Sequence, residues 1–429
     1  MDRAHQINAT KRYTEDDLDL LGRTFEETDL RPGTAWDMLK HSSMELPGWF
    51  KTNLDPFSDE YEAQQLRMWQ AISGRGRDYN PEVDELEVIG PGVDAVRFPA
   101  FYVARHPGAV QNAGNHLIAM GSILQHSGVK AGDWALEYGA GFGQTALALS
   151  RLGVNVDTVD ISKNFCGYVK ENAEFFGTSL TPHVGTFADL PRGKDHFYDL
   201  IYFYKAFHHC LNFRHLIKTM KSVLRPKTGR IILCAEPIFA DPTPAVPYPW
   251  GFRLDSETTS VTRSRGWLEL GFDQKFIVNL FQANGFKVRH IPCPQTMYGE
   301  IYVIEHRGDV IPMGEYWLAK KDAEGWYPPE SEGRWTKQEA TIPVDASPDF
   351  SALTVSLINH LPVKKNINLR CGNEAKSVTL QPSQAVDVGF QNNGSRSVQV
   401  TVECHRPMDI SSSPDARPLG IFVSHIRYL

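Results

Sequence analysis

The feature that most constrains the fold of this chain is a glycine-rich turn between a short apolar strand and a helix. Residues Leu136–Thr145 read L-E-Y-G-A-G-F-G-Q-T, which predicts a strand over Asp133–Tyr138 and a helix over about Gln144–Leu152. Glycines allow the sharp turn, and the unpaired N–H groups of the helix N-terminus can face an anionic group. Asp160 follows the next predicted strand, Val156–Val159, where its carboxylate can accept both hydroxyls of a ribose. The pattern therefore predicts a cofactor that contains adenosine.

The spacing of the three glycines distinguishes between kinds of cofactor. Gly139, Gly141 and Gly143 follow the pattern G-x-G-x-G, whereas the dinucleotide fingerprint is G-x-G-x-x-G. An acidic residue, Glu137, also stands two positions before the first glycine. This arrangement resembles motif I of the class I S-adenosylmethionine (SAM) methyltransferases. The resemblance implies an α/β, Rossmann-like core with a mostly parallel sheet, and SAM as the cofactor.

Two downstream segments extend the resemblance. Tyr198–Cys210 is similar to the fourth strand of that family and the turn after it, and Gly185–Pro191 is similar to its adenine-contacting segment. Thr186 replaces the usual acid of the second segment, so adenine contact through Thr186, the backbone of Phe187 or Asp189 stays open. The cofactor contacts that the resemblance implies are Glu137, Gly139, Gly141, Gly143, Asp160, Ile161, Thr186, Phe187 and Tyr204.

Besides the segments above, four others carry a further resemblance: Leu54–Tyr61, Glu236–Ile238, Pro247–Gly251 and Gly266–Gly271. Together they resemble a bacterial family of SAM-dependent methyltransferases associated with polysaccharide gene clusters. With the C-terminal part included, this resemblance spans most of the chain. It implies methylation of a sugar or glycan hydroxyl on an acceptor that is nucleotide-linked, lipid-linked or polymeric.

A proton acceptor is expected beside the cofactor, because a neutral sugar hydroxyl is a weak nucleophile. His208 and His209 follow the fourth strand at the predicted mouth of the pocket, and histidine titrates near neutral pH. Adjacent side chains cannot both face the pocket equally, so at most one of them is expected to be the base. Glu236, at the end of the predicted strand Arg230–Ala235, is the rival candidate. No metal is predicted, since the histidines show no recognised ligand spacing.

The acceptor is expected to bind at the loop after that strand. Residues Glu236–Asp255 are rich in proline, which predicts irregular structure, and long loops at the carboxyl ends of parallel strands commonly contact substrates. Arg253, Arg263 and Arg265 could clamp a phosphate or carboxylate, or could pair with nearby acidic residues. Trp250 could form a wall of the substrate pocket or fill the core.

The chain divides into three predicted parts. Residues 1–110 form a helical and irregular extension, with a helix over Asp59–Ser73, and residues 111–305 form the cofactor-binding core. Residues 306–429 contain short alternating runs with turn signals, which predict an all-β sandwich with a hairpin at Asn393–Gly394. This last part is a candidate for carbohydrate binding or for positioning the acceptor.

Charge and composition narrow the range of partners. The net charge of −7 argues against nucleic acid as a partner. No apolar run approaches the roughly 20 residues that span a membrane. The six cysteines lack C-x-x-C spacing, which predicts free thiols in a reducing, cytoplasmic compartment. The oligomeric state cannot be predicted.

Two other functions remain open. A nucleotide-sugar oxidoreductase would share the glycine turn and Asp160, but Tyr168 stands two residues before Lys170 and does not form a Tyr-x-x-x-Lys pair. A non-catalytic glycan-binding scaffold that keeps a SAM-binding core would also fit the sequence. Titration with S-adenosylhomocysteine and with NAD would distinguish these possibilities.

Overall fold

The computed structural model describes residues 12–28, 37, 39–85, 94, 96–98, 102, 107–314, 323–344 and 350–429. Contacts divide the chain into two compact units. The first comprises Met1–Arg225, Arg230–Asp273 and Ile291–Tyr302, and the second comprises Pro226–Gly229, Gln274–His290 and Val303–Leu429. The described part of the predicted N-terminal extension therefore shares the first unit with most of the predicted core, whereas residues 226–229, 274–290 and 303–305 of that core fall in the second unit.

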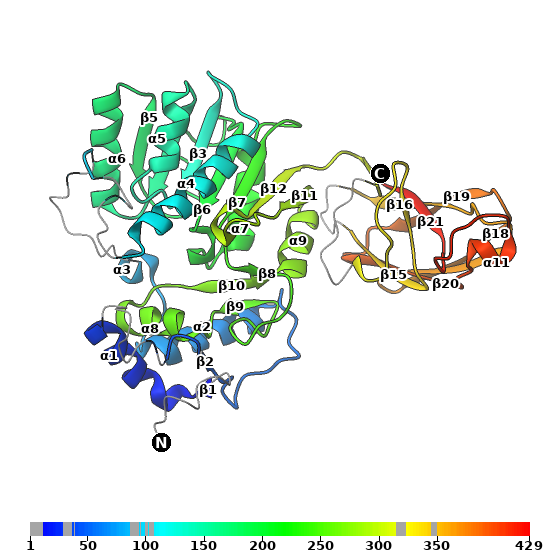
Figure 1. Cartoon of the computed structure of the whole chain (residues 1–429), viewed down its shortest axis with the longest axis horizontal. Coiled ribbons are helices and arrows are strands. Elements are labelled where there is room, and N and C mark those ends of the chain that lie inside the picture. Colours follow the sequence, from blue (N-terminus) through cyan, green and yellow to red (C-terminus); the bar gives the residue numbers. More distant parts are fainter. Residues whose placement is uncertain are drawn as a thin grey trace. The chain divides into compact units, whose positions relative to one another are not determined.

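A seven-stranded sheet confirms the predicted Rossmann-like architecture (Figure 1). Its strand order is β11-β12-β7-β6-β3-β4-β5, and the pairs among β3 to β7 are parallel. The central strands consist largely of apolar residues that are buried, as expected for a parallel sheet covered on both faces. The bounds are β3 (Trp134–Tyr138), β4 (Asn155–Asp160), β5 (Leu180–Val184), β6 (Leu200–Tyr204), β7 (Arg230–Cys234), β11 (Phe286–Ile291) and β12 (Ile301–His306).

Helices connect these strands. Helix α5 (Gln144–Arg151) contacts both α4 (Ala109–His126) and α6 (Lys163–Phe176), so the three lie side by side (Figure 1). Helix α7 (Phe213–Val223) buries an apolar face with period 3.6, formed by Phe213, Leu216, Ile217, Met220 and Val223. Helix α9 (Gln274–Gln282) precedes β11. No helix among the described residues is long and apolar enough to cross a membrane.

The N-terminal region packs on a later helix, α8 (Ser256–Arg265), through α1 (Leu18–Thr28) and α2 (Asp59–Ser73). The predicted helix over Asp59–Ser73 is confirmed: the Ser58 hydroxyl accepts a hydrogen bond from the N–H of Tyr61, and Gly74 ends the helix at φ 68°. The shorter elements here are β1 (Arg12–Tyr13), a 3-10 turn (Glu15–Asp17), β2 (Ser43–Met44) and α3 (Pro81–Asp84).

The prediction that Glu236–Asp255 is irregular was wrong in part. This segment contributes β8 (Ile238–Phe239) and β9 (Trp250–Phe252), which flank β10 (Leu270–Asp273) in a three-stranded sheet. Strand pairing is possible here because the prolines of the segment lie outside the two short strands.

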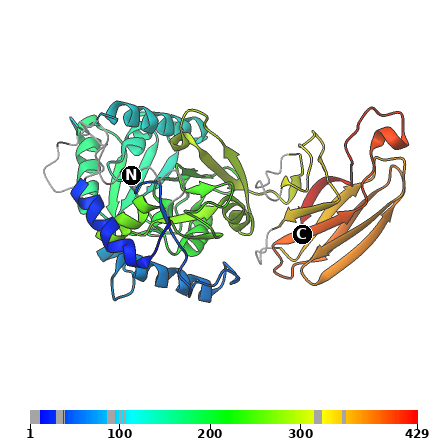
Figure 2. The ribbon, with the colours of Figure 1, turned by 60° about the horizontal axis from the view of Figure 1, so that its bottom comes forward.

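The C-terminal region forms two sheets, of five and four strands (Figures 1 and 2). Apolar residues from both sheets, among them Val355, Val423, Ile367 and Val400, join one buried cluster, as in a β-sandwich. The five-stranded sheet contains β13 (Val310–Pro312), β14 (Arg334–Trp335), β16 (Ala352–Ile358), β19 (Ala385–Gln391) and β21 (Phe422–Tyr428). The other contains β15 (Glu339–Pro343), β17 (Lys365–Cys371), β18 (Glu374–Leu380) and β20 (Ser397–Val402), and a short helix, α11 (Pro407–Ile410), precedes β21.

The hairpin predicted at Asn393–Gly394 was wrong. That turn joins β19 to β20, and these strands belong to different sheets. The tight hairpin lies instead between β17 and β18, where Gly372 adopts φ 58°. Both turns have glycine at a positive φ, so local turn chemistry cannot tell a hairpin from a connection between sheets.

Candidate active site at the carboxyl end of the sheet

A pocket with about 730 Å³ of empty space lies at the carboxyl ends of β3, β4 and β6. The strand order reverses between β3 and β6, and such a switch point is the usual ligand site of an open α/β sheet. Six of the nine predicted cofactor contacts line this pocket: Gly139, Gly141, Asp160, Ile161, Thr186 and Phe187.

The glycine turn after β3 is held in a backbone conformation that other residues rarely adopt. Gly139, Gly141 and Gly143 have φ values of 67°, 52° and 63°. A side chain at Gly139 would also meet Ala206, because a Cβ built there lies 2.6 Å from the Ala206 Cβ. Because these glycines have no side chains, the turn after β3 can pack against the turn after β6, and the pocket stays open to a ligand.

Asp160 is placed by hydrogen bonds on both sides of its carboxylate. Oδ2 accepts the N–H of Gly141 at 2.8 Å, and Oδ1 accepts the N–H of Ser162 at 2.9 Å. Each carboxylate oxygen can accept more than one hydrogen bond, so these contacts are compatible with ribose hydroxyls as further donors. Asp189, the other acid considered for this region, closes the local turn by accepting the N–H of Thr186 at 2.7 Å.

Three predicted cofactor residues are not among the described residues that line the pocket. Glu137 is buried under the glycine turn, where it accepts the hydroxyl hydrogen of Tyr202 at 2.9 Å, and burial raises its pKa to about 8. The Tyr204 hydroxyl is hydrogen bonded to His116. Gly143 lies at the start of α5 and packs against Val169 of α6. The contacts described for these residues support the pocket from beside it, and their direct contact with the cofactor stays a prediction.

The two histidines after β6 have different surroundings. His208 is buried, and its Nδ1 lies 2.7 Å from Oε2 of Glu236. Glu236 also accepts the N–H groups of Ala206, Phe207 and His208 at 2.8–3.1 Å. Burial opposes ionisation of Glu236, but His208 and these N–H groups lower its pKa below the usual value. These contacts show that Glu236 holds the turn in place, and its role as proton acceptor stays a prediction.

His209 faces the pocket together with a residue that the sequence did not suggest. Both His209 and Glu85 line the pocket, and His209 Nδ1 lies 3.2 Å from Oε2 of Glu85. Burial alone would lower the pKa of His209, but Glu85 beside it raises that pKa to about 9. Glu85 is fixed by the hydroxyl of Tyr79 at 2.9 Å and the N–H of Leu268 at 2.6 Å.

A third carboxylate, Glu269, lies beside the two histidines. Its Oε2 is 3.5 Å from Nε2 of His208 and 2.8 Å from Arg253. Burial opposes ionisation, whereas Arg253 and both histidines lower the pKa of Glu269. Glu269 belongs to the segment Gly266–Gly271, one of the segments that carry the family resemblance, and it is one of the acidic residues near the three predicted arginines.

The predicted substrate residues do not form one clamp. Arg253 pairs with Glu269, and Arg263 pairs with Asp19 and donates to the carbonyl of Ile72 at 3.3 Å. Arg265 is exposed and lies over the ring of Trp267, with 5.1 Å between guanidinium carbon and ring centroid. None of the three is among the described residues that line the pocket. The ion-pair alternative therefore applies to Arg253 and Arg263.

Trp250 fills the core, which is the second of the two roles considered for it. It is fully buried, its indole N–H donates to the carbonyl of Pro56 at 2.7 Å, and its ring contacts Tyr61 and Phe213. In the C-terminal region Trp326 and Trp335 are also buried. Of the aromatic residues Trp326, Tyr327 and Trp335, only Tyr327 is partly exposed, and Arg417 lies 5.3 Å from its ring centroid.

A family model described as a methyltransferase domain matches residues 136–233, which include the glycine turn, Asp160 and both histidines. The core is a SAM-dependent methyltransferase domain. SAM is accordingly the cofactor, and the pocket fits it: Gly139 and Gly141 allow close approach, and Asp160 offers a carboxylate at the tip of β4. Among curated proteins, no relative of this chain was found.

Solved structures show partial likeness to this methyltransferase. The YcgJ protein of Bacillus subtilis is 23% identical, over 41% of this chain and 70% of that one, with a TM-score of 0.34. A 1,6-didemethyltoxoflavin-N1-methyltransferase of Burkholderia thailandensis with bound S-adenosylhomocysteine is 17% identical, over 52% and 94%, with a TM-score of 0.34. A putative sarcosine dimethylglycine methyltransferase of Galdieria sulphuraria is 24% identical, over 28% and 44%, with a TM-score of 0.25. At such TM-scores these likenesses carry no weight for substrate or mechanism.

Proposed function

We propose that this protein transfers the methyl group of SAM to a hydroxyl of a sugar or glycan in bacterial polysaccharide biosynthesis, in the cytoplasm. The observation that carries the proposal is the His209–Glu85 pair on the cofactor pocket. A hydroxyl that attacks the methyl group must lose its proton, and we assign that proton to this pair because both residues line the pocket.

The residues divide into two groups by the task that the reaction gives them. SAM supplies a sulfonium methyl group as the electrophile, so the protein mainly has to align the acceptor oxygen, the methyl carbon and the sulfur. Asp160 and Ile161 are assigned to the ribose side of SAM, and Thr186 and Phe187 to the adenine side. The His209–Glu85 pair is assigned to the acceptor oxygen and its proton, with His208 and Glu236 as positioning residues beneath it.

The sugar substrate class is supported by the resemblance of several segments to polysaccharide-associated methyltransferases. We assign the C-terminal β-sandwich to holding the glycan acceptor. Of the predicted arginines, Arg265 is assigned to an anionic group of the acceptor, because it is exposed and carries no ion pair among the described contacts. Cytoplasmic location agrees with the six cysteines, all of which are free thiols in the described structure.

The test has two stages. First, the full chain is titrated with S-adenosylhomocysteine and, in a parallel cell, with NAD; binding of the first alone is expected. Second, the chain and SAM are incubated with nucleotide sugars, lipid-linked glycans and finished polysaccharide, and methylated products are located by mass spectrometry. An ether methyl on a sugar oxygen supports the proposal. Methylation only of nitrogen or carbon acceptors contradicts it, and cofactor binding without any transfer favours the glycan-binding scaffold.

A further inference from the structure

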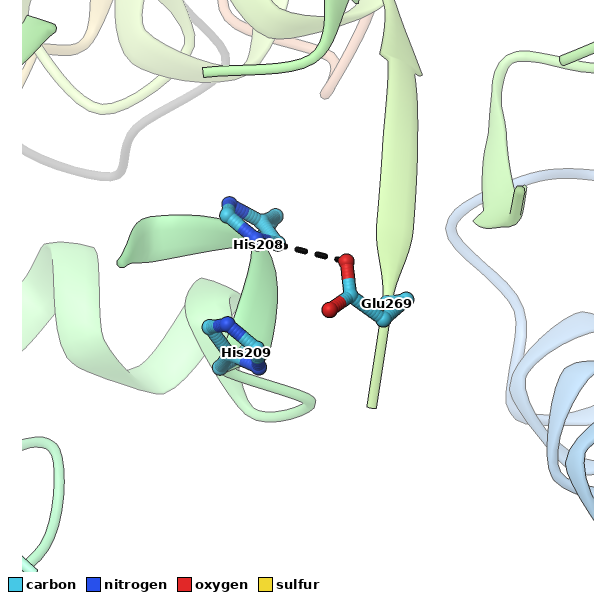
Figure 3. A group of neighbouring side chains, drawn as sticks. All are labelled: His208, His209 and Glu269. Carbon is cyan, nitrogen blue, oxygen red and sulfur yellow. Dashed lines mark ion pairs between the residues drawn. The ribbon is translucent and has the colours of Figure 1, made fainter. Parts of the chain in front are cut away.

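The side chains of His208, His209 and Glu269 converge at one point beside the pocket (Figure 3). Each offers one ligand atom, and these three atoms all lie within 4.8 Å of one another. The histidines belong to the 3-10 turn Phe207–His209, and Glu269 directly precedes β10. Two imidazoles and one carboxylate are a ligand set typical of catalytic zinc and of other divalent transition metals.

His208 has the surroundings of a metal-binding histidine. Its Nδ1 lies 2.7 Å from Glu236, while its Nε2 points toward Glu269 at 3.5 Å (Figure 3). Metal-binding histidines nearly always give their other ring nitrogen to a carboxylate, which fixes the tautomer and the orientation of the ring. Two ligands about 2.1 Å from a tetrahedral metal lie roughly 3.4 Å apart, close to the separation found here.

His209 likewise has a carboxylate beside one of its ring nitrogens. Its Nδ1 lies 3.2 Å from Glu85, at a geometry that forms an ion pair but no hydrogen bond, and this nitrogen is fully buried. With Nδ1 beside Glu85, Nε2 is the ring nitrogen left to bind a metal. Glu269 is itself held by Arg253 at 2.8 Å, as ligating carboxylates commonly are.

The charges around the trio also favour an added cation. Three carboxylates, those of Glu85, Glu236 and Glu269, gather here and are largely buried. Side-chain cations in this region come from Arg253, which pairs with Glu269, Lys205, which lines the pocket, and a protonated His209 beside Glu85. Once His209 gives up its proton to bind a metal, the three carboxylates exceed Arg253 and Lys205, and the divalent cation would offset the cost of that excess.

We propose that His208, His209 and Glu269 form a binding site for one divalent transition metal, with Zn²⁺ as the representative ion. Nitrogen ligands favour such ions over Mg²⁺, which prefers oxygen. Because His209 lines the cofactor pocket, the remaining coordination position of the metal faces that pocket.

The catalytic use of the site rests on the proposed function. An acceptor hydroxyl bound to the cation loses its proton more readily, and the carboxylate of Glu85, also on the pocket, takes that proton. The acceptor oxygen then forms a bond to the methyl carbon as the carbon–sulfur bond breaks, which leaves S-adenosylhomocysteine and a protonated Glu85. Electrons and atoms balance without a further reactant.

The experiment measures metal binding without relying on turnover. The full chain is treated with a chelator, dialysed, and titrated with Zn²⁺ by calorimetry and with Co²⁺ by visible absorption, which reports low-coordinate nitrogen and oxygen ligands. We expect one metal per chain. His209→Ala and Glu269→Gln should each weaken binding by more than about 100-fold, and Glu236→Gln, which removes a supporting carboxylate, by about 10–100-fold.

The control variant is His183→Ala. This residue forms another histidine–carboxylate pair in the same unit, with Asp157 at 3.2 Å, and should leave metal binding unchanged. Circular dichroism and S-adenosylhomocysteine binding establish that each variant is folded. No saturable binding, or binding that survives both His209→Ala and Glu269→Gln, overturns the proposal. If the chain binds the metal but does not methylate sugars, the metal site is supported and the proposed function is contradicted. If the metal-free chain methylates sugars at the full rate, the proposed catalytic use of the metal is contradicted.

Discussion

Two neighbouring turns at the same edge of the sheet show different ways to build half of an active site. The turn after β3, with Gly139 and Gly141, offers backbone N–H groups to the pocket, and Asp160 at the tip of β4 adds one carboxylate beside it. The turn after β6, with His208 and His209, offers side chains that are held by charged partners. The first depends on backbone conformation, and the second depends on buried electrostatics.

A buried glutamate lies at each turn, and the two differ in their pKa. Glu137, by the first turn, meets a tyrosine hydroxyl in an apolar surrounding, and burial raises its pKa to about 8. Glu236, by the second, meets His208 and three backbone N–H groups, and its pKa is lowered despite burial. The same side chain therefore serves as a near-neutral packing group in one turn and as a fixed negative charge in the other.

The largest expected effect comes from removing the side chain that the second turn presents to the pocket. His209→Ala should lower methyl transfer by at least about 100-fold, the ordinary size of a lost acid–base or metal-binding group. Affinity for S-adenosylhomocysteine should stay within about threefold, since His209 is assigned to the acceptor oxygen rather than to the cofactor. Initial rates with the acceptor found by screening, together with calorimetry, test both parts.

The matched control for this variant is His215→Ala, which removes an exposed histidine from α7 and should leave both quantities unchanged. A His209→Ala protein that keeps its turnover would remove the second turn from the reaction.

A substitution beside the first turn should instead weaken the binding of the cofactor. Asp160→Ala removes the acceptor for the Gly141 N–H and the predicted acceptor for the ribose hydroxyls. Hydrogen bonds to charged groups contribute about 1.5–3 kcal/mol each, so affinity for S-adenosylhomocysteine should fall by about 10–100-fold. Calorimetry measures the change, with Asp195→Ala, an exposed aspartate, as the control. Unchanged affinity in Asp160→Ala would contradict the assignment to ribose.

The contact between the two turns can be tested separately from their chemistry. Gly139→Ala places a Cβ 2.6 Å from that of Ala206, whereas Gly141→Ala meets nothing within 4 Å, although both residues have positive φ values. Both variants carry the conformational cost of the left-handed region, about 1–2 kcal/mol, and Gly139→Ala adds a packing clash of about 1–3 kcal/mol. Denaturant unfolding without cofactor should therefore find Gly139→Ala the less stable of the two. Equal stability would mean that Ala206 moves aside at little cost.

The first turn could be predicted from the sequence because its parts are close together in the chain. The glycine spacing and Asp160 report backbone conformation and strand order directly, and six of the nine expected cofactor residues line the pocket. Glu137, Gly143 and Tyr204 fall outside it, since a motif shows which residues share a turn but not which side of the turn each one faces.

The second turn could be predicted only in part. His208 and His209 stand out in the sequence, but Glu85 comes from the N-terminal region and Glu269 from the segment before β10. Their approach depends on how α2, α8 and the three-stranded sheet pack, and no local pattern encodes that packing. For the same reason Trp250 and Arg253, which could equally have lined a pocket, were resolved only by their neighbours in the fold.

The last comparison distinguishes the two buried glutamates by pH. The pKa of Glu137 rises from its ordinary 4.5 to about 8 on folding, so between these values the folded chain holds a proton that the unfolded chain has released. This group therefore makes the folded state less stable as pH rises from about 4.5 toward 8, and adds no further change above that range. Glu137→Gln removes the titrating group while keeping an acceptor for Tyr202, so it should be stabilising at pH 8 and close to neutral at pH 5.

Denaturant unfolding of the full chain at both pH values measures this difference, with Glu174→Gln as the control, because Glu174 is an exposed glutamate on α6. If Glu137→Gln were destabilising at pH 8, the carboxylate would have to be ionised and held by charge-assisted hydrogen bonds, as Glu236 is. Both turns would then be supported by a buried, ionised glutamate. The supporting residues would no longer distinguish the cofactor site, which depends on backbone conformation, from the acceptor site, which depends on buried charges.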